Sequence, residues 1–233
     1  MRIATPAALT LLVAGLLVPA AWAHGPRGSS GSTAADLGYP RFDYQPPAPG
    51  TYQLPAVKPA ADGQVVDATG TPRRLHELTG DRIVVLSFIS TRCSDAHGCP
   101  LATAVLHQLR EVAARDPALA RRLRLVTLSF DLAHDTPAVL ARFVPPARNG
   151  KTQTSPWVAV VPRSESELSS ILAAYGQPVG PRVVEAPPTH LLRVYLIDAR
   201  RQIRNVYGLD FLDPRLLAND ARTLLLEEQG RRP

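Results

Sequence analysis

Residues 83–100 read IVVLSFISTRCSDAHGCP and contain the clearest structural signals in the chain. The segment Ile83–Ile89 is apolar apart from one serine, and its length is typical of a strand that is buried on both faces. Proline is favoured at the first position of a helix, so Pro100 indicates a helix that begins near the second cysteine. A buried strand, a turn and a helix in this order are typical of α/β proteins, which place functional groups at such turns.

Strand and helix signals alternate on both sides of this segment. In addition to 83–89, strands are expected at residues 64–68, 72–78, 123–130, 157–161, 191–197 and 203–207. Helices are expected at residues 100–114, 136–143, 164–175 and 214–228, and a loop at residues 145–155. This alternation predicts an α/β fold, a three-layer sandwich with a mixed central sheet.

The composition is that of one folded domain with a basic surface. The 233 residues are enough for one well-buried core, and 45% hydrophobic with 20% charged residues lies in the globular range. The net charge of +6 comes almost wholly from arginines, which are scattered and have no aromatic residues between them. Nucleic-acid binding is therefore not expected. Met1 is the single methionine, so a metal would have to bind cysteine, histidine or carboxylate side chains.

The N-terminal segment has the features of an export signal. Arg2 precedes an apolar run, and Ala21-Trp22-Ala23 has the small residues of a cleavage site. We therefore expect residues 1–23 to be a cleaved signal peptide and the protein to be periplasmic or otherwise extracytoplasmic; a retained membrane anchor is the alternative. Residues 24–50 are rich in glycine, serine and proline, which predicts a flexible tether to a domain at residues 51–233.

Cys93 and Cys99 are the only cysteines, and both lie in the turn between the buried strand and the helix. Backbone N–H groups and the helix dipole are expected to favour a thiolate there, especially at Cys99. The pair could form a structural disulfide that closes a tight loop, a redox-active pair or part of a metal site. The five residues between the cysteines match no common zinc spacing, so spacing alone leaves these alternatives open.

Three segments, in this order, carry a family resemblance. After the apolar strand, Thr91-Arg92-Cys93 and Cys99-Pro100 are similar to the pattern T-x-C-P-x-x-C-P. Ser129–Pro137, which reads SFDLAHDTP, is similar to S-V-D-P-x-x-D-T-P. His190, followed by Tyr195–Asp198 (YLID), is similar to a metal-binding histidine ahead of a Y-L-I-D strand. Together these segments resemble the Sco/SenC family of thioredoxin-fold copper proteins.

The resemblance extends over residues 52–228 and implies a thioredoxin-like fold with a copper site formed by Cys93, Cys99 and His190. Two thiolates and one imidazole suit Cu(I), and Cu(II) could bind with a further oxygen or nitrogen donor. The implied function is delivery of copper to a client cuproenzyme, such as a cytochrome oxidase subunit. The thiols could instead be the catalytic redox pair of a thiol-disulfide oxidoreductase, with Cys93 as nucleophile. A binding module with a structural disulfide is the third alternative.

The loop between the cysteines departs from the family pattern. It has five residues, Ser94–Gly98, where the family usually has three, and it includes Asp95 and His97. His97 could be a fourth ligand, a proton shuttle or a loop residue that faces solvent, and the last is expected because a loop histidine needs no partner. Asp131 is expected either to support the site or only to precede a helix, and Trp157 is expected in the core.

Overall fold

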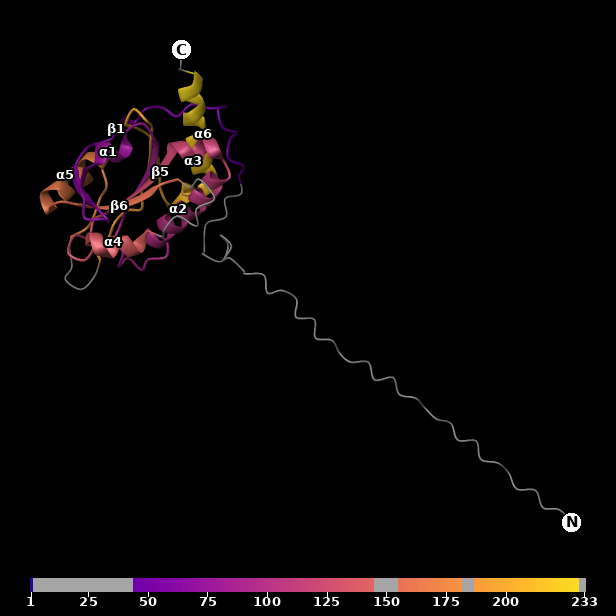
Figure 1. Ribbon diagram of the computed structural model, residues 1–233, viewed down its shortest axis with the longest axis horizontal. Coiled ribbons are helices and arrows are strands. Elements are labelled where there is room, and N and C mark those ends of the chain that lie inside the picture. Colours follow the sequence, from indigo (N-terminus) through magenta and orange to yellow (C-terminus); the bar gives the residue numbers. More distant parts are fainter. Residues whose placement is uncertain (2–43, 145–154, 182–186, 231–233) are drawn as a thin grey trace.

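The computed structural model describes Met1 and residues 44–144, 155–181 and 187–230. In this part of the chain one sheet has eight strands in the order β1-β8-β7-β4-β5-β6-β2-β3, with helices around it (Figure 1). The strands are β1 (Lys58–Pro59), β2 (Gln64–Asp67), β3 (Pro72–Arg74), β4 (Ile83–Ile89), β5 (Leu123–Ser129), β6 (Trp157–Pro162), β7 (Val194–Ile197) and β8 (Gln202–Tyr207). The helices are α1 (Leu75–Thr79), α2 (Cys99–Ala114), α3 (Pro117–Arg122), α4 (Pro137–Phe143), α5 (Glu165–Tyr175), the 3-10 helix η2 (Leu209–Phe211) and α6 (Pro214–Gly230).

Strand β4 lies in the middle of the sheet, and its seven residues are all buried, as the apolar run predicts. It is parallel to β5 on one side and antiparallel to β7 on the other. Strand β5 is in turn parallel to β6, and β7 is antiparallel to β8. The prediction of a mixed central sheet is therefore confirmed.

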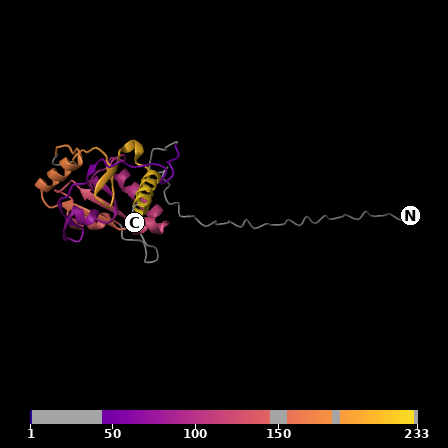
Figure 2. The same cartoon turned by 90° about the horizontal axis from the view of Figure 1, so that it is seen from above.

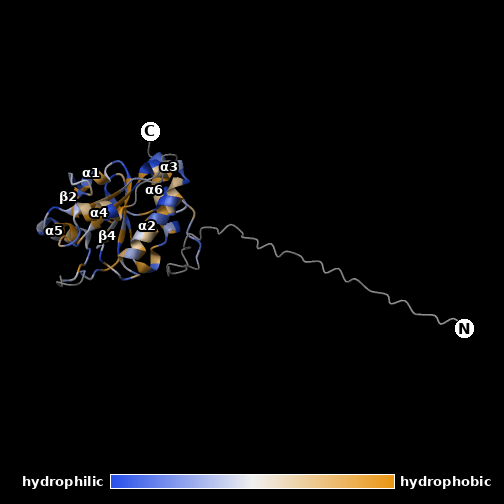
Figure 3. Cartoon of the chain, turned by 60° about the horizontal axis from the view of Figure 1, so that its bottom comes forward, coloured by the Kyte–Doolittle hydropathy of each residue, from blue (hydrophilic) through white to orange (hydrophobic). Residues whose placement is uncertain are grey.

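Helices cover both faces of this sheet, which makes the three predicted layers. On one face, Leu109 of α2 and Leu217 of α6 belong to a hydrophobic cluster with Leu125 of β5. On the other face, Ile171 of α5 packs in a cluster with Phe88 of β4. Figures 1 and 2 show α5 and α6 on opposite sides of the domain, and Figure 3 shows hydrophobic and hydrophilic residues mixed on α2 and α6. Such amphipathic helices bury one stripe against the sheet and leave the other in water.

One predicted element is wrong in its second half. The strand expected at residues 72–78 ends at Arg74, and Leu75–Thr79 forms the short helix α1. Leu75 and Leu78 are both buried, and a spacing of three residues places them on the same side of a helical turn. Helical periodicity over so few residues is too short to be distinguished from a strand by sequence.

Three short elements, α3, β1 and η2, were not expected from the sequence. Helix α3 begins after Asp116, whose carboxylate accepts hydrogen bonds from the backbone N–H groups of Ala118 and Leu119. An Asp-Pro pair at this point is a helix-start signal, because Asp caps the helix and Pro117 occupies its first position. Strand β1 has only two residues and pairs with the edge of β8, so it is too short to give a pattern.

The predicted signal peptide at residues 1–23 lies outside the described residues apart from Met1, and so does most of the predicted tether. The end of that segment contacts α6: the Pro47 carbonyl accepts a hydrogen bond from Asn219 Nδ2 (3.0 Å), and Gly50 N donates to Thr223 Oγ1 (3.0 Å). The predicted loop at residues 145–155 is described only at its last residue. Among the helices that the structure describes, none has the length and apolar character to cross a membrane.

Candidate metal centre

The two cysteines lie where the chain leaves β4 and enters α2. The Cys93 backbone N–H donates to the Ser90 carbonyl (3.1 Å), which closes a turn directly after the strand. Cys99 is the first residue of α2 and is 3% exposed, whereas Cys93 is half-buried. The Ser90 backbone N–H donates to Cys99 Sγ (3.3 Å), and both cysteines are free thiols. The strand exit thus holds one sulfur inside the fold and one near its surface.

The extra length of the loop between the cysteines is taken up by a tight turn at Asp95. The backbone N–H of Gly98 donates to the Asp95 carbonyl (2.9 Å), and the N–H of His97 donates to Asp95 Oδ1 (3.0 Å). A Cβ atom on Gly98 would lie 3.3 Å from Cys93 Sγ, so a glycine allows the loop to pass close to this sulfur. His97 is exposed and is not part of the metal-binding group, which agrees with the expectation of a solvent-facing loop residue.

His190 reaches the same place from the segment that precedes β7. It forms an isolated antiparallel bridge with Val179, and its ring packs on Phe130 with the ring centroids 4.8 Å apart. Its Nε2 atom lies 3.6 Å from Cys99 Sγ. The packing against an aromatic ring limits how far the imidazole can turn away from the sulfur.

The Cys93 and Cys99 sulfurs and one ring nitrogen of His190 all lie within 4.8 Å of one another. The prediction that these three side chains converge is therefore confirmed, although His190 follows Cys99 by 91 positions. The reason is the antiparallel pairing of β4 with β7, in which Ser87 is opposite Val194. Because β4 and β7 run in opposite directions, the end of β4 lies beside the start of β7. The residues that follow β4 and those that precede β7 therefore meet at the same edge of the sheet.

Burial shifts the pKa of two of the candidate ligands, Cys99 and His190. It raises the pKa of the Cys99 thiol, and the nearby Cys93 raises it further, while the hydrogen bond from the Ser90 N–H acts in the opposite direction. Burial lowers the pKa of His190, which the negative charge of Asp95 partly opposes. The expectation of a thiolate favoured at Cys99 is therefore wrong for the metal-free protein, because burial outweighs the helix dipole. A bound cation would have to displace the Cys99 proton.

Two buried carboxylates hold the turn that precedes Cys93. Asp131 Oδ2 accepts hydrogen bonds from Ser90 Oγ (3.0 Å) and from the Nε and Nη2 atoms of Arg92 (both 3.0 Å). Asp135 Oδ2 accepts from the Thr91 backbone N–H (3.0 Å). Asp131 thus supports the site rather than only preceding a helix. The role of Asp135 was missed, although the D-T-P part of the 129–137 segment contains it.

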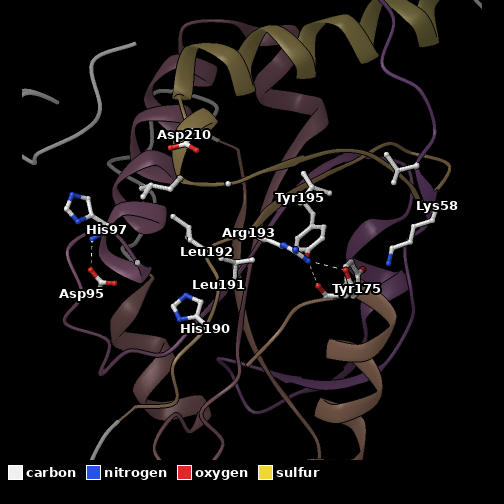
Figure 4. A pocket seen from close by; sticks show the side chains of 16 residues that line it. Lys58, Asp95, His97, Tyr175, His190, Leu191, Leu192, Arg193, Tyr195 and Asp210 are labelled. Atoms are coloured by element: carbon white, nitrogen blue, oxygen red, sulfur yellow. Dashed lines mark hydrogen bonds between the residues drawn. The ribbon is translucent and has the colours of Figure 1, made fainter. Parts of the chain in front are cut away.

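An open cavity of about 840 Å³ lies beside His190. Figure 4 shows Asp95 and His97 on one side of His190, with Lys58 and Tyr175 on the other. The apolar side chains at the rim of the cavity are Leu191, Val206 and Leu209, which are 52%, 38% and 38% exposed. The candidate metal centre is thus open to an approaching molecule on the His190 side.

Trp157 and two histidines outside the metal-binding group have structural contacts. Trp157 is buried and donates from Nε1 to Thr127 Oγ1 (2.9 Å), so its expected place in the core is confirmed. His107 packs edge-on against Trp157, with ring centroids 4.8 Å apart. His76 Nε2 lies 2.9 Å from the carbonyl oxygen of Ala60.

A mixed α/β sandwich with two thiols at the exit of a central strand and a histidine opposite them defines a thioredoxin-like domain with a Cys-Cys-His cluster. Residues 58–225 match the family SCO1/SenC, and the chain belongs to this family. No curated protein sequence matches the chain.

Solved structures of Sco proteins have the same fold. Arabidopsis thaliana ScoI with copper bound is 15% identical, with a TM-score of 0.60 over 72% of this chain and 98% of that chain. Bradyrhizobium japonicum ScoI with copper bound is 17% identical, with a TM-score of 0.55 over 70% and 97% of the two chains. BsSco, described as having a disulfide switch and as a member of the Sco family of cytochrome c oxidase assembly proteins, is 16% identical, with a TM-score of 0.59 over 74% and 98%.

Proposed function

We propose that this protein is an extracytoplasmic copper chaperone that binds one copper ion through Cys93, Cys99 and His190 and delivers it to a client cuproenzyme such as cytochrome c oxidase. The observation that carries the proposal is the convergence of two free thiols and one imidazole nitrogen within 4.8 Å. A purely structural disulfide module would have no need for the histidine.

The chemistry of the three donors suits copper. Thiolate sulfur and imidazole nitrogen are soft and borderline ligands, and three of them satisfy the low coordination number of Cu(I). The lowered pKa of His190 keeps its ring neutral at physiological pH, which is the form that binds metals. Zinc accepts the same ligand types, so a preference for copper rests on geometry and supply.

The relatives and the N-terminal sequence support the remaining parts of the proposal. Two of the solved Sco proteins have copper bound, and a third is described as belonging to a family of cytochrome c oxidase assembly proteins. The extracytoplasmic location rests on the signal-like sequence of residues 1–23 alone.

Delivery requires that a partner reach the bound ion. Cys99 is buried beneath the loop, whereas Cys93 is half-buried and His190 lines the open cavity. An incoming donor from a client would therefore approach along the cavity and replace Cys93 or His190 before Cys99.

A thiol-disulfide oxidoreductase is the second candidate, and the unequal burial of the two cysteines favours it. In this reaction the Cys93 thiolate attacks a client disulfide and releases one client thiolate. Cys99 then loses its proton and attacks the mixed disulfide at Cys93, which releases the second client thiolate. The client disulfide is reduced and the Cys93–Cys99 pair is oxidised.

Metal analysis of the reduced protein tests the copper proposal. We expect one copper per chain, and a large loss of affinity in each of Cys93→Ser, Cys99→Ser and His190→Ala. His97→Ala is the matched control, because this exposed histidine lies in the same loop without belonging to the metal-binding group. An equal loss in His97→Ala would overturn the three-ligand site.

His190→Ala separates the two candidate functions. A copper carrier needs the imidazole as its third donor, whereas thiol exchange needs only the two sulfurs. We expect His190→Ala to stop copper delivery to the client and to leave reduction of a disulfide test peptide largely intact. Full activity of every extracytoplasmic copper enzyme under copper limitation in His190→Ala cells, but not in Cys93→Ser cells, would contradict the chaperone proposal.

A further inference from the structure

We infer that Asp95, in the loop between the two cysteines, is a fourth donor to the bound copper and makes the site favour Cu(II) over Cu(I). The inference rests on the proposed copper site and adds a specificity-determining residue to it. It concerns a carboxylate that the longer inter-cysteine loop brings to this position.

The loop geometry places Asp95 beside the first cysteine. A Cβ atom on Gly98 would lie 3.3 Å from Cys93 Sγ and 3.5 Å from Cβ of Asp95, so the sulfur and the aspartate side chain flank the same point. The turn is held by two hydrogen bonds to Asp95, from His97 N to Oδ1 and from Gly98 N to the carbonyl oxygen. Although Asp95 is exposed, these two hydrogen bonds hold its backbone carbonyl and one of its carboxylate oxygens in the turn.

Asp95 also lies in the neighbourhood of the histidine. Asp95 and His190 line one cavity together with Gly98, and Figure 4 shows Asp95 on the loop side of the His190 ring. Asp95 is the charged group whose field opposes the burial effect on the pKa of His190. Asp95 thus lies beside the three converging ligands but outside their group, so its carboxylate would have to turn toward the ion in order to bind it.

Its second carboxylate oxygen is available for a ligand. Oδ1 accepts the His97 N–H, whereas Oδ2 has no hydrogen bond to the residues that the structure describes. His97 is the other candidate in the loop, but the field of Asp95, and not that of His97, acts on the pKa of His190. The carboxylate is therefore the better placed of the two added donors.

The charge and hardness of a carboxylate determine which copper ion it favours. Cu(I) is satisfied by two thiolates and an imidazole, while Cu(II) prefers four donors and accepts oxygen readily. With the carboxylate included, the ligands carry three negative charges, which the divalent ion balances better than the monovalent one. Asp95 should therefore strengthen Cu(II) binding and leave Cu(I) binding nearly unchanged.

Asp95→Asn tests this inference without disturbing the turn, because the asparagine side-chain oxygen can still accept the His97 N–H. We expect the affinity for Cu(II) to fall ~10-fold, the size of effect typical for groups that tune a metal site. Unchanged Cu(I) affinity, measured by competition with a Cu(I) chelator, would then raise the copper midpoint potential by about 59 mV, the one-electron equivalent of a tenfold change. The electron paramagnetic resonance spectrum of the Cu(II) protein should change at the same time.

Asp210→Asn is the matched control, because Asp210 lines the same cavity but belongs to η2, away from the loop between the cysteines. We expect it to leave the Cu(II) affinity and the spectrum as in the native protein. Asp95→Ala also removes the acceptor of the turn and shows how much of the effect comes from the loop conformation.

Four results would overturn the inference. They are an unchanged Cu(II) affinity and spectrum in Asp95→Asn, equal effects of Asp95→Asn and Asp210→Asn, equal losses of Cu(I) and Cu(II) affinity, and a loss that occurs only in Asp95→Ala. Failure of the native protein to bind either copper ion would instead overturn the proposed function, and the role of Asp95 with it.

Discussion

The cluster around Arg204 and the metal centre both bring together polar groups from distant parts of the chain, but they satisfy those groups differently. Arg204 is 9% exposed and donates to the Leu54 carbonyl from Nε (2.8 Å), to Asp198 Oδ2 from Nη1 (2.9 Å) and to Glu227 Oε2 from Nη2 (2.8 Å). Its charge is neutralised and its donors are engaged within the fold, as a buried cation requires.

The metal centre has no such internal balance. The Cys99 sulfur accepts a hydrogen bond from the Ser90 backbone N–H and lies 3.6 Å from Nε2 of His190. The Cys93 sulfur is the third member of the group. All three side chains can offer electron pairs to a metal ion, and Arg92, the cation in the turn before Cys93, is paired with Asp131. A structural polar cluster is complete as folded, whereas this one becomes complete when a metal ion binds.

Arg204→Met should therefore have a large effect on stability and none on copper binding. Methionine keeps an unbranched apolar stem but leaves Asp198 and Glu227 without their buried cation, and breaking a buried ion pair costs about 3–5 kcal/mol. Urea denaturation of the metal-free protein measures the loss. Copper stoichiometry of the protein that remains folded should stay at that of the native chain.

Arg200→Met is the control for this substitution. Arg200 is exposed on the same hairpin, and its backbone N–H rather than its guanidinium contacts Asp198 (2.9 Å). Its removal should change the unfolding free energy by less than about 0.5 kcal/mol, as expected for a surface site. Similar losses in the two variants would show that the Arg204 cluster is not a special stabilising element.

Asp131→Asn should affect both stability and copper binding, because Asp131 belongs to the support of the metal centre. The substitution removes the charge that holds Arg92, and loss of a charged buried hydrogen bond costs about 1–3 kcal/mol. Because Ser90 also holds Cys99 Sγ, we expect copper affinity to fall ~10-fold as well. Denaturation and chelator competition measure the two effects.

Asp67→Asn distinguishes a supporting role from general destabilisation. Asp67 is also buried and paired with an arginine, Arg73 (3.1 Å), but it lies in β2 near the far edge of the sheet. We expect this variant to lose stability and to keep its copper affinity. An equal loss of affinity in both variants would remove the evidence that Asp131 acts on the site.

The raised pKa of Cys99 makes the metal-free protein less stable in alkaline solution. Below the ordinary thiol pKa of 9.0 this cysteine is protonated in both states, whereas above it only the unfolded chain ionises. The unfolding free energy should therefore fall as pH rises through 9, by about 1.4 kcal/mol per pH unit for one proton. Denaturation at several pH values under reducing conditions measures the slope.

Cys99→Ser should lose the part of this slope that lies between the ordinary thiol pKa of 9.0 and the ordinary tyrosine pKa of 10.0. Above that range the buried tyrosines also contribute, because burial raises their pKa in the same direction. An identical slope in Cys99→Ser and the native protein would show that Cys99 does not stay protonated in the fold.

The sequence was informative where a pattern is long or a motif is specific. The apolar run Ile83–Ile89 predicted the central strand, and the resemblance identified Cys93, Cys99 and His190, which the pairing of β4 with β7 then brings together. It was uninformative where three-dimensional burial decides the outcome. The position of Cys99 at the start of a helix predicted a lowered thiol pKa, but burial by the surrounding side chains raises that pKa instead.

Short elements were the other difficulty. The α1 helix has five residues, and the spacing of Leu75 and Leu78 becomes meaningful only once both are known to be buried. The role of Asp135 depends on its contact with Thr91, 44 positions earlier, and no local pattern reports such a pairing. Expectations from sequence therefore fail where burial, or a distant contact that no motif signals, decides the structure.

Gly98→Ala should have the smallest effect, and it tests how tightly the incomplete cluster is packed. Alanine is a poorer helix N-cap than glycine, which costs about 0.5–1 kcal/mol at the start of α2. The added Cβ would also lie 3.3 Å from Cys93 Sγ, so the sulfur has to shift by a few tenths of an ångström. We expect a small loss of copper affinity beyond the loss of stability, measured by chelator competition.

Gly208→Ala provides the comparison, because Gly208 precedes η2, lines the same cavity and has nothing within 4 Å of the position of an added Cβ. If the two alanine variants bind copper equally well, the close approach of Gly98 to Cys93 does not constrain the metal centre.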